Sequence, residues 1–122
     1  MKKLIITLVA ATLLTLGAAT AAEQAASKTL VHVVTVSWKA GTTPEQINAA
    51  LDGAKALPAS YPGITHVWTK TLKAQGERTN AIVMEFSDAA VFAAYTDSAA
   101  QKEWYKLYLP IRDHSTTFDV TE

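Results

Sequence analysis

The sequence predicts an α+β domain with the element order β-α-β-β-α-β, and three observations support this. Runs rich in β-branched residues alternate with segments whose apolar residues recur at helical spacing. Helix-capping residues precede each helical segment. Turns that contain Gly or Pro separate the elements of the first half. This order predicts a ferredoxin-like fold, in which a four-stranded antiparallel sheet carries both helices on one face.

The first half of the fold is predicted to hold two strands and the helix between them. Residues 29–38 are β-branched almost throughout and form the first strand. Thr43 is the expected N-cap of a helix, because a proline follows it and Gln46 completes a capping box. The apolar residues of 47–57 fall on one helical stripe. After a Tyr-Pro-Gly turn, residues 64–72 form the second strand.

The second half repeats the pattern in the order strand, helix, strand. Residues 80–86 form the third strand, and Asp88 caps the helical segment that follows. A polar break interrupts that segment. Ser98 and Gln101 make a second capping box, which restarts the helix. A proline and a polar cluster are expected to end it, leaving residues 117–120 as a short last strand.

Residues 1–22 have the pattern of a secretory signal peptide. Two lysines precede an apolar run of roughly 16 residues, and small residues allow cleavage after Ala21 or Ala22. The alternative is an uncleaved membrane anchor, but the run is shorter than the ~20 residues that span a bilayer. We therefore expect a periplasmic or secreted protein without a membrane anchor. Residues 23–28 would form a flexible leader and residues 29–122 the folded domain.

Charge and cysteine content restrict the partners of that domain. Without the two lysines of the signal segment, 9 basic and 11 acidic residues give a net charge of −2. No basic stripe is available for nucleic acid or for an anionic membrane surface. The chain contains no cysteine, so no disulfide stabilises it. Stability must come from packing within the domain, or from packing together with a partner chain.

The first strand is apolar on both faces near its start, which predicts a homodimer. Val34 and Val36 share one face, while Val31 and Val33 lie on the other. Helices are expected to cover only one face, so a second copy that packs sheet to sheet would cover the other. The alternative is a half-exposed strand whose extra valines reflect β-propensity alone.

Several short motifs, in order, carry a resemblance to a known family. They are the opening Val31-His32-Val33-Val34, the Leu57-Pro58 and Tyr61-Pro62-Gly63-Ile64 corner, Phe86-Ser87-Asp88 leading to Tyr95, and Pro110 with Phe118-Asp119. Together they resemble the stress-responsive dimeric α/β-barrel family over residues 32–120. The resemblance implies two protomers that press their sheets into a barrel, and a pocket between sheet and helices. Monooxygenase and heme-degrading barrels share this architecture.

The family includes a plant polyketide cyclase, and its site residues are matched only in part. The resemblance implies a histidine on the first strand, where His32 stands, and a tyrosine on the helix after the third strand, where Tyr95 stands. The family's acid/base histidine is replaced by Gln101, and another histidine by Asn80. Glutamine does not exchange a proton near neutral pH, so the sequence argues against catalysis by the plant mechanism.

The candidate ligand pocket combines apolar side chains with a few polar groups. It consists of His32, Val34, Val36, Ile82, Tyr95, Gln101 and Trp104. His32 is either a hydrogen-bonded structural histidine or a ligand contact that pairs with the Tyr95 hydroxyl. Tyr95 is otherwise a core residue, and Gln101 otherwise a capping residue.

The leading interpretation is a homodimeric barrel that binds a small hydrophobic or aromatic molecule. One alternative is a cofactor-independent enzyme, cyclase-like or monooxygenase-like, that uses His32 and Tyr95. Another is a structural assembly protein without a ligand. The three histidines do not have metal-ligand spacing, so we expect neither a metal nor another cofactor.

Overall fold

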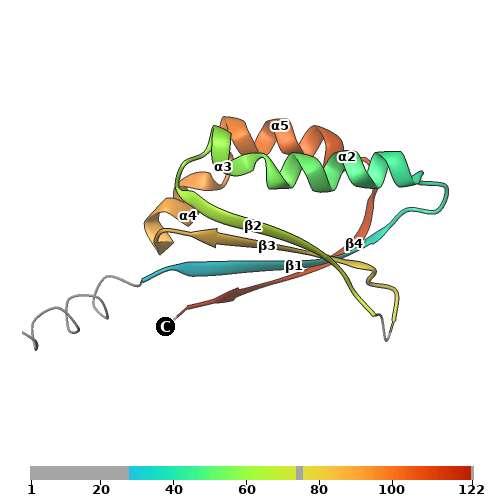
Figure 1. Ribbon diagram of the computed structural model, residues 1–122, viewed down its shortest axis with the longest axis horizontal. Coiled ribbons are helices and arrows are strands. Elements are labelled where there is room, and N and C mark those ends of the chain that lie inside the picture. The colour runs from blue at the N-terminus through green and yellow to red at the C-terminus, as the bar shows by residue number, and fades with distance from the viewer. Residues whose placement is uncertain (1–27, 74–75, 122) are drawn as a thin grey trace, which may run out of the picture.

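The described part of the chain forms one sheet with helices packed over a single face. The computed structural model describes residues 28–73 and 76–121, so the predicted signal peptide lies outside it. The sheet is antiparallel with the order β2-β3-β1-β4, which confirms the ferredoxin-like prediction (Figure 1). The elements in chain order are β1 (Leu30–Trp38), α2 (Pro44–Lys55), α3 (Leu57–Ser60), β2 (Ile64–Thr71), β3 (Asn80–Phe86), α4 (Ala89–Tyr95), α5 (Ala99–Tyr108) and β4 (Arg112–Val120).

Side-chain caps set the starts of the helices. Thr43 Oγ1 accepts from the Gln46 amide at 3.2 Å, and Gln46 Oε1 accepts from the Thr43 amide at 2.9 Å, so the capping box at α2 is complete. Asp88 accepts from the Val91 amide at the start of α4. Ser98 accepts from the Gln101 amide at the start of α5. Each cap satisfies a backbone donor that the first helical turn leaves free.

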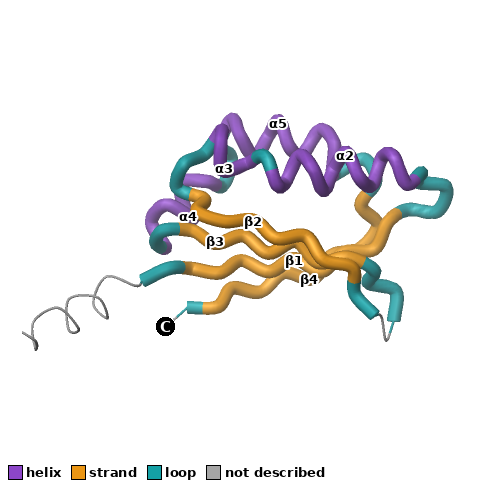
Figure 2. The backbone as a smooth tube through the Cα atoms, in the orientation of Figure 1, coloured by secondary structure: helices purple, strands orange, loops and turns teal. Residues whose placement is uncertain are grey.

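The core fills the layer between the sheet and helices α2, α3 and α5, which lie over one face of it, while α4 lies near one end of the strands (Figure 2). The strands contribute the fully buried Val36, Ile82 and Phe86, and α2 contributes Ala50 and Ala54. These small residues on α2 let it approach α5 closely. The indole Nε1 of Trp104 donates to the Ala50 carbonyl oxygen at 2.9 Å, which fixes α5 against α2.

The last strand is longer than the sequence predicts. We expected residues 117–120, whereas β4 begins at Arg112 and pairs with β1 as far as Trp38. Its early residues are polar and mostly exposed, because β4 is an edge strand. Backbone pairing with β1 therefore extends the strand where side-chain hydrophobicity gives no signal. The register shifts between Val36 and Trp38, where the His114 amide donates to the Ser37 hydroxyl at 3.3 Å.

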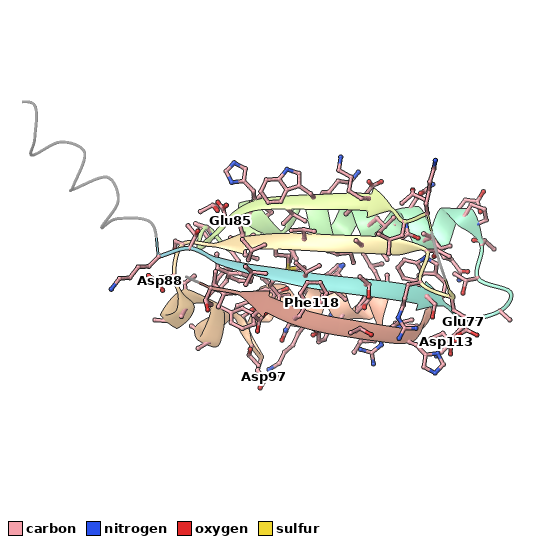
Figure 3. All side chains as sticks on the ribbon, turned by 90° about the horizontal axis from the view of Figure 1, so that it is seen from below. Glu77, Glu85, Asp88, Asp97, Asp113 and Phe118 are labelled. Carbon is pink, nitrogen blue, oxygen red and sulfur yellow. The ribbon has the colours of Figure 1, made fainter. Side chains whose placement is uncertain are left out.

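The opposite face of the sheet, seen in Figure 3, has no helix over it. We call it the open face. Phe118, Val120 and Trp68 are 51%, 53% and 41% exposed there, and Phe118 lies on the edge strand β4, opposite Val33 of β1 (Figure 3). Val31 and Val33 are only half-buried on the same face. Large apolar side chains gathered on one face are typical of a protein interface.

Candidate functional site

A cavity of about 280 Å³ lies between the helix-covered face of the sheet and helices α4 and α5. Its walls come from β1, β3 and β4 below and from the two helices above. Five of the seven predicted pocket residues line it: His32, Val34, Tyr95, Gln101 and Trp104. Val36 and Ile82 do not, because both side chains are fully buried in the core instead. The sequence shows which face these two residues share, but not how tightly α2 and α5 cover it.

His32 makes a short hydrogen bond across the β1–β4 pairing. Its Nδ1 lies 2.6 Å from Asp119 Oδ1, and the two residues are direct partners in the antiparallel register. The rings of Phe92 and Phe86 lie 5.0 and 6.4 Å from the imidazole, between centroids. The His32 side chain is 17% exposed. The carboxylate fixes the orientation of the imidazole and leaves Nε2 as the only ring nitrogen free for another partner.

Tyr95 is buried, but its hydroxyl does not pair with His32 as the sequence suggested. The side chain is 2% exposed, and its ring packs against Tyr61 and Phe86 at centroid distances of 5.3 Å. No hydrogen-bond partner for its hydroxyl is found among residues 28–73 and 76–121. Burial raises the pKa of Tyr95 well above its usual range, and Tyr105 and Tyr61 raise it further. The Tyr95 hydroxyl is therefore neutral, and it is buried behind the cavity wall.

Gln101 has a structural role that differs in detail from the predicted capping box. Its Oε1 accepts from the Asp97 amide at 2.7 Å, not from the amide of Ser98, and its Nε2 donates to the Tyr105 hydroxyl at 3.1 Å. Asp97 has a positive φ of 65°, so the chain turns sharply before α5 and brings that amide to Gln101. Both polar ends of the Gln101 side chain are thus already paired.

Asn80, the other substituted family position, also has a structural role. Its Oδ1 accepts from Trp38 Nε1 at 2.8 Å and from the Thr79 hydroxyl at 3.0 Å. Trp38 in turn packs edge-on against Tyr108 beneath α5. These bonds hold one end of the sheet together and do not involve the cavity.

Sequence reasoning missed the aromatic and charged residues on the side of the cavity formed by α5 and β4. Tyr105 and Tyr108 line it, and burial raises the pKa of both hydroxyls. The Arg112 guanidinium carbon lies 5.8 Å from the centre of the Tyr108 ring. Arg112 and Ser115 lie near the Tyr108 hydroxyl and oppose its pKa rise without reaching hydrogen-bonding geometry. Helical spacing places Tyr105 and Tyr108 near each other, but the sequence does not show that β4 runs beneath them.

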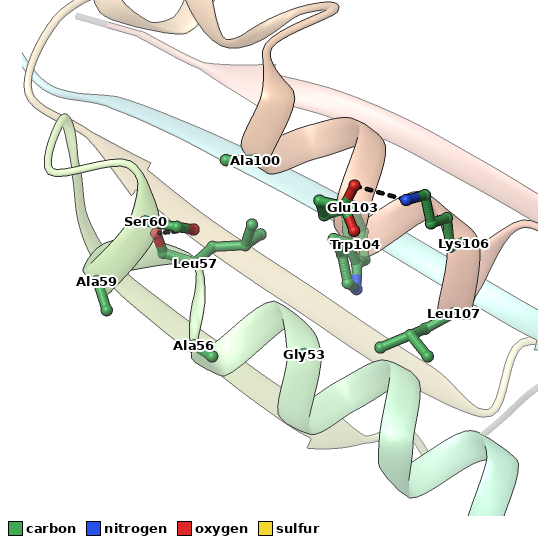
Figure 4. A pocket seen from close by; sticks show the side chains of 10 residues that line it. All are labelled: Gly53, Ala56, Leu57, Ala59, Ser60, Ala100, Glu103, Trp104, Lys106 and Leu107. Atoms are coloured by element: carbon green, nitrogen blue, oxygen red, sulfur yellow. Dashed lines mark hydrogen bonds and ion pairs between the residues drawn. The ribbon is translucent and has the colours of Figure 1, made fainter.

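A second, larger depression of about 580 Å³ lies on the outer surface, between α5 and the α2–α3 segment. Figure 4 shows its small and apolar lining, which includes Gly53, Leu57 and Leu107. Its charged side chains, Glu103 and Lys106, form an ion pair with each other. We call it the outer groove. Trp104 lies between the outer groove and the cavity and contributes to both.

In the described part of the chain, no three His, Cys, Asp or Glu side chains lie close enough together to bind a metal ion. No helix of residues 28–73 or 76–121 is long and apolar enough to cross a membrane.

The sequence matches the family model described as the stress responsive A/B barrel domain over residues 30–122. The chain belongs to this family. No curated protein matches the sequence.

Three solved structures illustrate the shared fold. The hydroxynitrile lyase of Passiflora edulis has a TM-score of 0.71 at 17% identity, over 78% of this chain and 94% of the lyase. A family protein from Mesorhizobium loti has a TM-score of 0.68 at 18% identity, over 78% and 97% of the two chains. A dimeric ferredoxin-like protein from Thermobifida fusca has a TM-score of 0.68 at 18% identity, over 78% and 92%.

Proposed function

We propose that the protein is an exported homodimeric barrel that binds one small aromatic or hydrophobic molecule in the cavity between sheet and helices. The lining of the cavity carries this proposal. Aromatic rings from α4 and α5 face side chains of β1 and β4 that include His32 and Arg112. A mostly aromatic lining with a few convergent polar groups is typical of a small-molecule site. Export rests on the pattern of residues 1–22 alone.

The size and lining of the cavity limit the ligand. Its volume of about 280 Å³ is at the lower end for small-molecule sites, which begin near ~300 Å³. Trp104, Tyr105, Tyr108 and Phe92 present aromatic rings, while Thr96 and Thr117 add small polar groups. A molecule built on one aromatic ring, with one or two oxygen atoms, suits this space.

Binding is tested by isothermal titration calorimetry against a panel of single-ring aromatic compounds. Thr117→Trp places a large ring at the cavity wall and should abolish binding, because Thr117 lines the cavity from the edge strand. Leu107→Ala is the matched control. It enlarges the outer groove, does not line the cavity, and should leave binding unchanged. A panel without any saturable binder, or binding that survives Thr117→Trp, refutes the proposal.

Dimerisation is supported by the exposed apolar residues of the open face, and the Thermobifida fusca protein is described as dimeric. Phe118→Asp would replace a large exposed apolar side chain of that face with a charge and should convert the dimer to a monomer. Leu107→Asp is the control, since Leu107 is similarly exposed, at 45%, on the helical side. Sedimentation velocity distinguishes the species. A monomeric wild-type protein contradicts the barrel.

The His32–Asp119 pair favours one second function, proton transfer on the bound molecule. A histidine held by a carboxylate is a suitable general base, provided that its other nitrogen reaches the ligand. Deuterium exchange next to the carbonyl of small aryl ketones, followed by NMR, tests it. Exchange should exceed the buffer rate and be lost in His32→Ala, and Asp119→Asn should reduce it. Exchange at the buffer rate excludes this function for aryl ketones.

A further inference from the structure

Arg112 gives the cavity a positive charge whose partner is absent from the described part of the chain. It begins β4, just beyond the end of α5, and its side chain lines the cavity beside Tyr108. An arginine side chain carries its charge at every physiological pH and has five N–H donors. Such a group at a cavity wall favours an anionic ligand.

The nearby carboxylates of β4 are already engaged elsewhere. Asp113 pairs with His114 at 2.9 Å, and Asp119 pairs with His32 at 2.6 Å. Among residues 28–73 and 76–121, no carboxylate oxygen lies within 4.0 Å of an Arg112 nitrogen. Contact with the face of Tyr108 holds the guanidinium in place without neutralising it.

We propose that the cavity selects aromatic carboxylates, with Arg112 as the residue that binds the carboxylate. This inference rests on the proposed binding function and names its ligand class. The guanidinium matches a carboxylate with two parallel hydrogen bonds. The ring of the ligand then lies among Trp104, Tyr105 and Tyr108.

Benzoate and benzamide test this inference, because they have nearly the same shape and differ in charge. Calorimetric titration of the wild-type protein should give benzoate an affinity about 10- to 100-fold above that of benzamide. Arg112→Gln should remove this preference, and a urea-unfolding transition like that of the wild type should show that the variant is folded. Arg112→Lys should retain part of the preference, since a lysine keeps the charge but lacks the planar fork.

Arg78→Gln is the control for a change in overall charge. Arg78 precedes β3, does not line the cavity, and donates to the Thr116 hydroxyl at 3.2 Å. Benzoate affinity should not change in this variant. Equal affinity of the wild-type protein for the two probes overturns the carboxylate inference and leaves the binding function standing. Failure of both probes, together with the whole aromatic panel, overturns both.

Discussion

Tyr95→Phe should stabilise the unliganded protein, although it removes a polar group from a buried residue. The Tyr95 side chain is 2% exposed, and no partner of its hydroxyl is found in the described structure. A buried hydroxyl without a partner costs about 1–3 kcal/mol, and its removal breaks no hydrogen bond. We therefore expect the free energy of unfolding to rise by about 1 kcal/mol.

Tyr61→Phe is the matched control, since the two tyrosine rings are in contact at 5.3 Å. The Tyr61 hydroxyl donates to the Val91 carbonyl oxygen at 2.9 Å. Removal of this bond should lower the free energy of unfolding by about 1 kcal/mol. Urea unfolding at pH 7 gives the free energy of unfolding of both variants, provided that its dependence on urea concentration has the same slope in the variants and the wild type. If Tyr95→Phe is destabilising by as much as Tyr61→Phe, the Tyr95 hydroxyl has a partner and the reasoning fails.

The pH dependence of the stability of Tyr95→Phe provides a second check. Burial raises the pKa of Tyr95 in the folded protein, whereas the unfolded chain titrates near the ordinary value of about 10. The stabilisation that belongs to a raised pKa is fully present below pH ~10 and is lost as the pH rises above that value. Tyr95→Phe should therefore lose less stability than the wild type between pH ~9 and ~11. If the free energy of unfolding falls equally in the wild type and in Tyr95→Phe over this range, the pKa of Tyr95 is not raised.

Three further substitutions test the packing. A Cβ on Gly63 would collide with Val91 Cγ1, so Gly63→Ala should cost about 1–3 kcal/mol, and Val91→Ala should recover part of it in a double-mutant cycle. Thr43→Ala should lower the free energy of unfolding in urea by about 1 kcal/mol, because the α2 cap is lost. No change would mean that the cap does not contribute to stability. Trp104→Phe should cost about 2 kcal/mol in thermal unfolding, since it leaves the buried Ala50 carbonyl without its indole donor; a neutral result argues against that bond.

The fold was predictable where local chemistry determines the structure. Thr43, Asp88 and Ser98 each have a side-chain oxygen at the position that a helix start requires, and all three cap helices in the structure. β1 was predictable because β-branched residues suit a pleated strand. The start of β4 was not, because Arg112 and the polar residues after it are held there by pairing with β1, and the register of that pairing is non-local.

The site was predictable only in part for the same reason. The alternation of β1 places His32 and Val34 on the pocket side, and helical spacing does the same for Trp104. The partner of His32 depends on the β1–β4 register, which puts Asp119 directly opposite. The sequence alone suggested Tyr95 as the partner of His32, and this prediction was wrong. The β1–β4 register depends on pairing across the whole sheet, which the local sequence does not show.

The edge position of β4 makes the proposed ligand preference easy to change. Arg112, Ser115 and Thr117 supply polar wall to the cavity, and Asp119 orients His32, yet none of the four is buried. The buried residues that hold the layers together lie instead on β1, β2, β3 and the helices, together with Ile111 just before β4. Under the proposed function, substitutions at these four positions should change recognition at little cost to folding. This one strand is a natural starting point for a library that retargets the cavity to other small molecules.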